Sequence, residues 1–204
     1  MLMSKEVRKL DMQFKAEDNE DGKMEIKGYA VVFNSPETYS YTEVISPTAL
    51  DEADMSDVVL RYNHNDSFMV LARTRNKSLQ LEKDDKGLMI DAVLQDDITD
   101  HRNIYNAIKS GLIDKQSFAF SVDEDEYDYD TDTRTITKIG KLFDVSVVDQ
   151  PFYNATDVSI ARKENDEFLE KREELRKQHE QELEEQKKQQ ELQARKQAIL
   201  DKLG

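Results

Sequence analysis

A serine, a histidine and an aspartate in this 204-residue chain have the types and local settings that nucleophilic catalysis requires. Ser117 lies in a short alternating strand pattern, His64 follows an apolar strand, and Asp144 interrupts another apolar strand. A serine hydroxyl becomes a nucleophile when a neighbouring base takes its proton, and an acidic group orients and stabilises that base. These residues predict acyl-transfer chemistry if the fold brings them together.

The chain offers three histidines as the base. His179 lies in a highly charged segment and is predicted to be a surface residue, and His101 falls at a predicted helix start, where a polar residue is ordinary. His64 comes directly after a strand, where the scaffold holds a base while the turn leaves it reachable. The residues alone leave open the alternative that His64 is structural.

Asp144 is the candidate for the acidic group. It stands among apolar neighbours, and a carboxylate in such surroundings is costly to leave unpaired, so we expect it to have a partner. Asp149 is interpreted as a turn residue, because it precedes Pro151 at the end of the same strand. Scattered histidines without any cysteine give no metal-ligand spacing, and we expect neither a metal nor a cofactor.

The elements that position these residues read as many short strands and two short helices. Ser46 followed by Pro47 predicts a helix from Pro47 to about Ala53. A second helix begins near Thr99 and ends before Gly111. The acidic stretch 123–133 is predicted to be a mobile hairpin tip. The pattern favours a mainly β fold with helices (α+β), largely antiparallel, as a barrel or sandwich, with strands at 7–14, 24–33, 57–62, 71–74, 78–81, 87–94, 134–138 and 141–148.

Composition excludes several classes of function. The formal charge of −15 and the absence of a basic stripe argue against nucleic acid as a partner. No apolar run approaches the roughly 20 residues that span a bilayer, and the first residues lack the apolar core of a signal peptide, so no membrane association is expected. The absence of cysteine excludes disulfide bonds. These features predict a soluble, unsecreted protein.

The pattern changes near residue 161, which divides the chain into a predicted folded domain (1–160) and a charged helical tail (161–204). Glu, Lys, Gln and Arg dominate the tail, with i,i+4 pairs such as Glu167 with Lys171 and Glu173 with Lys177. Its apolar residues are too sparse for a sustained coiled-coil seam. The tail is therefore predicted to be a solvated helix, partly disordered in isolation, a weak coiled coil, or a docking helix for a larger assembly.

Six sequence blocks follow one another along the chain: GYAVVFN (28–34), EVISPTAL (43–50), Asn63-His64, DDKGLMIDAVL (84–94), IKSGLIDKQSFAF (108–120) and KLFDVSVVDQPFYNATDV (141–158). Together they resemble, over Lys9 to Ile160, the tailed-phage prohead protease family. That family is similar in fold to the herpesvirus capsid-maturation proteases, the assemblins. The resemblance implies a compact, largely antiparallel β-barrel with flanking helices.

The resemblance also implies roles for the candidate residues. Ser117 corresponds to the nucleophile, His64 to the general base and Asp144 to the orienting acid. The family more often has Glu at the position of Asp144, which shortens the reach here by one methylene. It also tends to have Met before the serine and Gly two residues after it, where this chain has Gln116 and Ala119.

The function implied by the resemblance is a serine endopeptidase of prohead maturation. Its substrates would be the scaffolding protein, or the scaffold-like segment of the major capsid protein, and the protease itself. It would act inside the assembling prohead in the host cytoplasm, as a homodimer or higher assembly, with the tail trimmed or bound to capsid subunits. The alternatives are a non-catalytic capsid assembly or scaffolding module of the same fold and a carbohydrate- or small-ligand-binding barrel.

Overall fold

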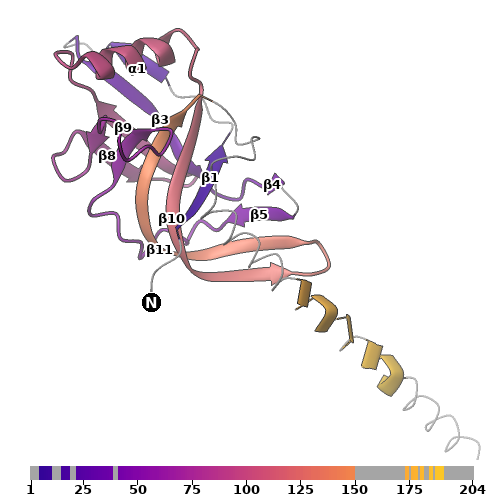
Figure 1. The fold of residues 1–204 in the computed structure, drawn as a ribbon. Helices are drawn as coiled ribbons and strands as arrows, with labels where there is room; N and C mark the ends of the chain where they lie inside the picture. The colour runs from indigo at the N-terminus through magenta and orange to yellow at the C-terminus, as the bar shows by residue number, and fades with distance from the viewer. Residues whose placement is uncertain are drawn as a thin grey trace, which may run out of the picture. The chain divides into compact units, whose positions relative to one another are not determined.

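The structure is a computed structural model that divides the chain into two compact units, Met1–Asp157 and Val158–Gly204 (Figure 1). It describes residues 5–10, 15–18, 22–38 and 41–149 of the first unit. In the second unit it describes residues 173–174, 176–178, 180–181, 184–185 and 187–190. The predicted boundary at residues 160 and 161 lies outside the described residues and stays a prediction.

A seven-stranded sheet forms the larger part of the first unit (Figure 1). Its strands follow the order β1-β10-β11-β5-β4, and β6 and β7 join it through β11. Their bounds are Glu6–Leu10 (β1), Glu37–Thr38 (β4), Thr42–Ile45 (β5), Val59–Tyr62 (β6), Ala72–Arg73 (β7), Lys115–Asp128 (β10) and Thr133–Val148 (β11).

Strand β11 is the axis of this sheet, because it pairs along both of its edges. One edge runs antiparallel to β10 over almost its whole length. The other edge pairs in parallel first with β5 and then with β6, from Thr133 to Ile136 and from Asp144 to Val147. The site residues therefore depend on pairings between segments far apart in the sequence.

A four-stranded antiparallel sheet, in the order β2-β3-β9-β8, completes the first unit. Contacts between β10 and β3, and between β7 and β8, join the two sheets, and helix α1 (Thr99–Lys109) packs against β2 and β3. Within the described residues these sheets form no closed ring, so the predicted barrel is not seen. The mainly β, largely antiparallel character is as predicted, with strands at Lys15–Asp18 (β2), Met24–Val32 (β3), Leu79–Lys83 (β8) and Gly87–Val93 (β9).

The hydrophobic core lies between the two sheets and α1. Alternate residues of β10 enter it, and the rings of Phe118 and Phe120 stack with centroids 4.9 Å apart. Burial of a large apolar side chain stabilises a fold by about 1.5–3 kcal/mol. The core therefore holds β10 firmly and leaves Ser117, Ala119 and Ser121 on the opposite face of the strand.

The second predicted helix is confirmed as α1. Its apolar residues Ile104, Tyr105 and Ile108 are buried, and Gly111 follows its end with φ of 74°. A left-handed residue lets the chain close the helix, and glycine takes that conformation without a Cβ clash. The sequence pattern was informative here because both the periodicity and the termination signal are local.

The helix predicted from Pro47 to Ala53 is wrong, because this segment forms a series of turns. Each backbone hydrogen bond here joins an amide to the carbonyl three residues earlier. The amides of Ala49, Asp51 and Ala53 donate to the carbonyls of Ser46, Thr48 and Leu50, respectively. The carbonyl of Ala49 accepts from the amide of Ile139 on β11 instead of continuing a helical ladder. A tertiary hydrogen bond thus replaces the local one that the Ser-Pro signal indicated.

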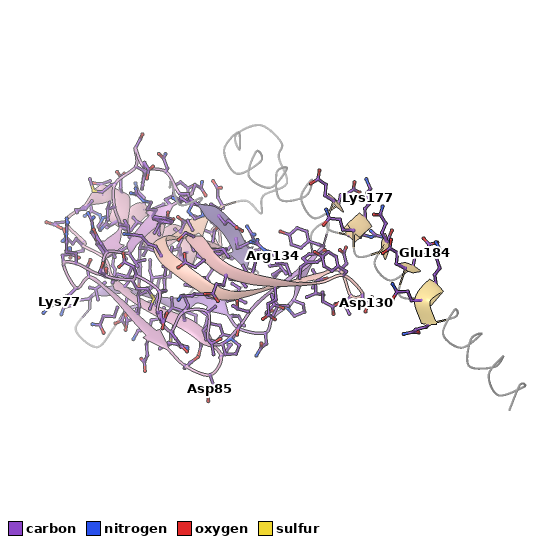
Figure 2. The ribbon with its side chains drawn as sticks, turned by 90° about the horizontal axis from the view of Figure 1, so that it is seen from below. Lys77, Asp85, Asp130, Arg134, Lys177 and Glu184 are labelled. Atoms are coloured by element: carbon purple, nitrogen blue, oxygen red, sulfur yellow. The ribbon has the colours of Figure 1, made fainter. Side chains whose placement is uncertain are left out.

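The predicted closing strands at 134–138 and 141–148 are a single strand, and the acidic stretch forms the predicted hairpin, with paired strands along most of its length. Strand β10 continues to Asp128, which leaves residues 129–132 as the turn, with Asp130 at the end of the hairpin (Figure 2). At Gly140 a Cβ would lie 2.2 Å from Oδ1 of Asp123, so a larger residue there would require this exposed side chain to move. The acidic side chains are accommodated because most of them are exposed.

The described residues of the second unit are helical. Ion pairs at i,i+4 spacing join Arg176 to Glu180 (3.3 Å), Lys177 to Glu173 (3.8 Å) and Lys188 to Glu184 (2.8 Å). Such pairs stabilise an exposed helix only weakly, because water and salt screen the charges. The Glu167–Lys171 pair and His179 lie outside the described residues, and the coiled coil stays a prediction.

Candidate active site

Three neighbouring strands bring Ser117, His64 and Asp144 together. Strand β11 lies in the middle and carries Asp144, β10 on one side carries Ser117, and β6 on the other side ends two residues before His64. Ser117 pairs with Ser146 across the β10–β11 ladder. Asp144 lies on the same face as Ser146, because side chains two residues apart on a strand share a face.

A continuous chain of polar contacts connects the three side chains. The Oγ of Ser117 lies 2.6 Å from Nε2 of His64, and Nδ1 of His64 contacts Oδ1 of Asp144. Ser117 is fully buried and Asp144 is 2% exposed. An ionised carboxylate only accepts hydrogen bonds, so His64 donates through Nδ1 and leaves Nε2 facing the serine hydroxyl.

His64 and Lys5 oppose the effect of burial on the pKa of Asp144. Burial alone raises the pKa of a carboxyl, but the hydrogen bond and charge of His64, together with the ammonium of Lys5 at 2.9 Å, hold the pKa of Asp144 below its ordinary value. Asp144 is therefore ionised at neutral pH. It supplies the negative charge that stabilises a protonated imidazole.

The backbone around His64 is held in an unusual conformation. Asn63 and His64 both have positive φ, of 53° and 52°, a region that costs a non-glycine residue free energy. The amide of Asn63 donates to Val147, and its side-chain amide donates to Asp149 at 3.0 Å. Asp149 also accepts from the hydroxyl of Tyr62 at 2.6 Å. Burial, together with the hydrogen bond and charge of Asp149, raises the pKa of Tyr62 to about 12.

Ser146 is a site residue that sequence reasoning missed. Its fully buried Oγ accepts from the amide of His64 at 3.1 Å and donates to Oδ1 of Asp144 at 3.1 Å. It also lies 3.1 Å from Nδ1 of His64. The available signal was its i+2 spacing from Asp144, which predicts a shared face. Ser146 thus joins the backbone of the histidine to the carboxylate.

The other singled-out residues have different settings. His101 is buried in α1, where Nδ1 accepts from the amide of Gln95 and Nε2 contacts the carbonyl of Val70 at 3.0 Å, so it is structural. Gln116 is fully buried, and neither atom of its amide has a partner among the described residues. Ala119 is also buried and pairs with Asp144 on β11.

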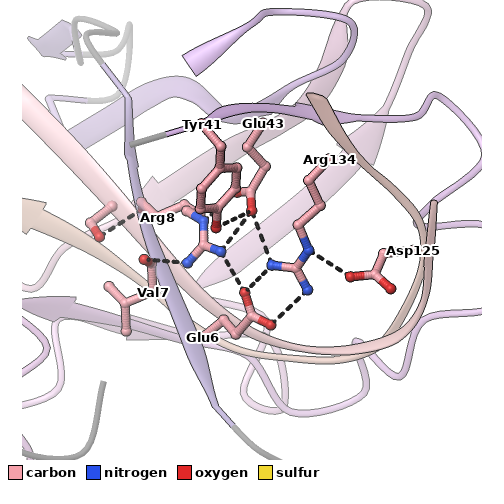
Figure 3. A network of polar contacts seen from close by, with 8 residues as sticks. Glu6, Val7, Arg8, Tyr41, Glu43, Asp125 and Arg134 are labelled. Carbon is pink, nitrogen blue, oxygen red and sulfur yellow. Dashed lines mark hydrogen bonds and ion pairs between the residues drawn. The ribbon is translucent and has the colours of Figure 1, made fainter. Parts of the chain in front are cut away.

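The N-terminal strand lies against the site and is tied to it by buried charges. Strand β1 runs antiparallel to β10, with Lys9 opposite Ser117. On β1, Arg8 contacts Glu43, and Glu6 accepts from Arg134 at 2.8 and 3.1 Å (Figure 3). Burial lowers the pKa of Arg8, but the charge and hydrogen bonds of Glu43 and the charge of Glu6 more than compensate, so the pKa is raised overall. Arg8 therefore remains charged within this buried network.

The arrangement suits general-base-assisted nucleophilic attack. A serine hydroxyl, an imidazole and a carboxylate stand in sequence with hydrogen-bond separations, which is the geometry that acyl transfer uses. Within the described ranges, no group of three or more His, Asp or Glu side chains is arranged to hold a metal ion. None of the helical segments in the described part of the chain has the length and apolar character that a membrane crossing requires.

Comparison with known proteins assigns the chain to a family. The caudovirus prohead serine protease family matches residues 10–171. The chain belongs to this family. Among solved structures, the capsid assembly protease gp21 of bacteriophage T4 is similar, with 11% sequence identity and a TM-score of 0.42 over 70% of this chain and 98% of that chain. No curated protein matches. Membership of the prohead serine protease family identifies the chain as a serine protease of phage capsid maturation.

Proposed function

We propose that this prohead serine protease cleaves peptide bonds with Ser117 as nucleophile, His64 as general base and Asp144 as orienting acid. The observation that carries the proposal is the chain of contacts from the Ser117 hydroxyl through both nitrogens of His64 to Asp144. Family membership supports the reaction class. Ser146, which contacts both His64 and Asp144, is a positioning residue in this scheme.

The proposed reaction has two stages. His64 takes the proton of Ser117 as Oγ attacks the peptide carbonyl, and Asp144 stabilises the resulting imidazolium. His64 then gives the proton to the leaving amine, which breaks the C–N bond and leaves an acyl-enzyme. Water, deprotonated by His64, attacks the ester, and the proton returns to Ser117 as the carboxylic acid leaves.

The proposed substrates are the scaffolding protein, or the scaffold-like segment of the major capsid protein, and the protease itself. Cleavage takes place inside the assembling prohead in the host cytoplasm, where the enzyme contacts capsid components. In this proposal the protease associates with itself as a dimer or larger assembly. The charged helix of residues 161–204 docks the enzyme to scaffold or capsid subunits, or forms a weak coiled coil.

The test is co-expression of the chain with the scaffolding and capsid proteins of its phage, followed by mass spectrometry. We expect truncated partner or self masses with the wild type and intact masses with Ser117→Ala. Ser121→Ala is the matched control, since Ser121 is also a buried β10 serine but contacts the amide of Lys141 rather than a histidine. If proheads assemble and the masses are intact in all three samples, the proposed protease activity is refuted and the non-catalytic assembly module is favoured.

A further inference from the structure

Both oxygens of the Asp144 carboxylate are engaged, and Lys5 holds the one that does not face the histidine. Oδ1 of Asp144 contacts Nδ1 of His64 and accepts from the hydroxyl of Ser146 at 3.1 Å. Oδ2 accepts from the ammonium of Lys5 at 2.9 Å. The chain of polar contacts that runs from Ser117 through His64 to Asp144 therefore continues to a cation at its far end.

Burial strengthens the contact between Lys5 and Asp144. The side chain of Asp144 is 3% exposed and that of Lys5 is 38% exposed, so the lysine reaches a shielded carboxylate from the surface. A charge-assisted hydrogen bond is stronger where water does not screen it. The ammonium also lies 5.7 Å from the ring centroid of Phe143, a distance at which an aromatic ring attracts a cation. Two consecutive residues of β11 thus hold the ammonium.

The ammonium of Lys5 offsets the negative charge that Asp144 presents to His64. A carboxylate stabilises a protonated imidazole, and a cation on the far side of the same carboxylate weakens that stabilisation. A general base must be neutral before it can take a proton, so a histidine that is held too strongly in its protonated form is a poor base at neutral pH. Lys5 therefore favours the neutral imidazole while its ion pair keeps Asp144 ionised and oriented.

The other charged groups on the described elements around His64 have partners among themselves or in a hydroxyl group. They are Arg61 with Asp66 on the turn of His64, Asp149 with Tyr62 at the end of β11, and Arg8 with Glu6 and Glu43 on the β1 side. From β10, the imidazole meets the uncharged hydroxyl of Ser117. Asp144 and Lys5 are thus the two charges aligned behind Nδ1 of the imidazole.

We propose that Lys5 is a positioning residue of the active site. It holds Oδ2 of Asp144 and offsets its charge, so that the imidazole of His64 loses its proton at a lower pH than it would beside the carboxylate alone. This inference rests on the proposed roles of Ser117, His64 and Asp144. The ammonium of Lys5 bonds to the carboxylate, so Lys5 acts on the base through Asp144.

Histidine titration in the full chain measures this effect directly. The three histidines are labelled with ¹³C at Cε1 and followed by NMR from about pH 4 to 9, and the signal that is lost in His64→Gln identifies His64. Lys5→Met keeps the length of the side chain and removes its charge. In this variant the pH at which half of His64 is protonated should rise by about one unit relative to the wild type. Lys5→Arg keeps the charge and should titrate like the wild type.

Lys141→Met is the matched control. The ammonium of Lys141 also lies near the ring of Phe143, at 5.9 Å from its centroid, but it pairs with Asp54 at 3.0 Å rather than with Asp144. Since water and salt screen that exposed charge, the midpoint of His64 should move by less than about 0.3 units. The signal of His101, which is buried in α1, checks that each variant is folded. A midpoint in Lys5→Met that moves no more than in Lys141→Met overturns the inference.

The rate at which a fluorophosphonate probe labels Ser117 connects this titration to the chemistry. The serine proton passes to neutral His64, the phosphorus of the probe bonds to Oγ, and fluoride leaves. On the acid side of the pH profile, Lys5→Met should label about tenfold more slowly than the wild type, and the two rates should converge at about pH 9. A merely structural loss would instead lower the rate at every pH.

The two measurements separate failure of this inference from failure of the proposed function. If the wild type labels and the pH profile of Lys5→Met coincides with it, the role of Lys5 is refuted and the proposed protease stands. If Ser117 of the wild type labels at no pH, the reactive serine of the proposed function is refuted, and this inference with it.

Discussion

Replacing Ser146 by alanine tests whether its hydroxyl positions the proposed base, His64, in addition to stabilising the fold. The change removes a hydroxyl that accepts from the amide of His64 and donates to Asp144, both at 3.1 Å. An unpaired buried amide costs about 1–3 kcal/mol. His64 already occupies a positive φ of 52°, which persists only where the surroundings hold it.

The expected magnitude follows from these two costs. We expect the free energy of unfolding of Ser146→Ala to fall by about 2 kcal/mol. If a free-energy difference of about 1.4 kcal/mol separates the productive from the relaxed position of His64, the rate at which a fluorophosphonate probe labels Ser117 falls about tenfold. The Ser146 hydroxyl contacts the base and the carboxylate and not the nucleophile, so we expect the loss in the maximal labelling rate and not in the probe concentration at half-maximum.

The assay compares urea unfolding and fluorophosphonate labelling in two serine variants. Ser121→Ala also removes a buried serine hydroxyl that accepts a backbone hydrogen bond, from Lys141 at 3.0 Å, but no atom of the proposed triad contacts it. It should lose about 1–2 kcal/mol of stability and label at the wild-type rate. Equal labelling by both variants at similar stability loss would refute the positioning role of Ser146.

Three further variants test other parts of the structure. Burial raises the pKa of Glu6, but Arg134 and Arg8 more than offset this and lower the pKa from 4.5, so the stabilisation by Glu6 is complete above pH 4.5 and is lost as the pH falls. In Glu6→Gln, the dependence of the free energy of unfolding on pH, measured with urea between pH 3 and 6, should be smaller than in the wild type by up to about 1.4 kcal/mol per pH unit. An unchanged pH dependence contradicts the pairing. Gln116→Met removes a buried amide without described partners and should raise the free energy of unfolding by about 1–2 kcal/mol, whereas a decrease would reveal a partner. Asp144→Asn should slow serine labelling about 10⁴-fold through loss of the correct imidazole tautomer, and a rate near that of the wild type rules out the orienting role.

Elements whose signals lie within one segment of sequence formed as predicted, and elements that depend on contacts with distant strands did not. The helix ending before Gly111 was predictable, because its periodicity and its glycine termination are encoded within one segment. The turns after Ser46 were not, because the amide of Ile139 bonds to the carbonyl of Ala49 from a distant strand. Likewise, the continuity of β11 through Gly140 depends on its long pairing with β10.

The candidate site shows the same division. The residue types and the resemblance in sequence blocks named Ser117, His64 and Asp144, and the structure brings them into contact. Their catalytic roles stay a proposal. For Ser146 the sequence offered only its i+2 spacing from Asp144, because its importance lies in a hydrogen bond to the amide of a residue 82 positions away.

The sequence by itself determined the family, the mainly β character and the residues able to do chemistry, since these depend on residue types and local order. Only the tertiary structure decided the strand register that brings β6, β11 and β10 side by side, and the position of β1 over the serine. The contact between Ser117 and the carbonyl of Arg8 joins residues 109 positions apart. Such contacts arise from the balance of burial, charge pairing and backbone hydrogen bonding over the whole fold, which no short stretch of sequence contains.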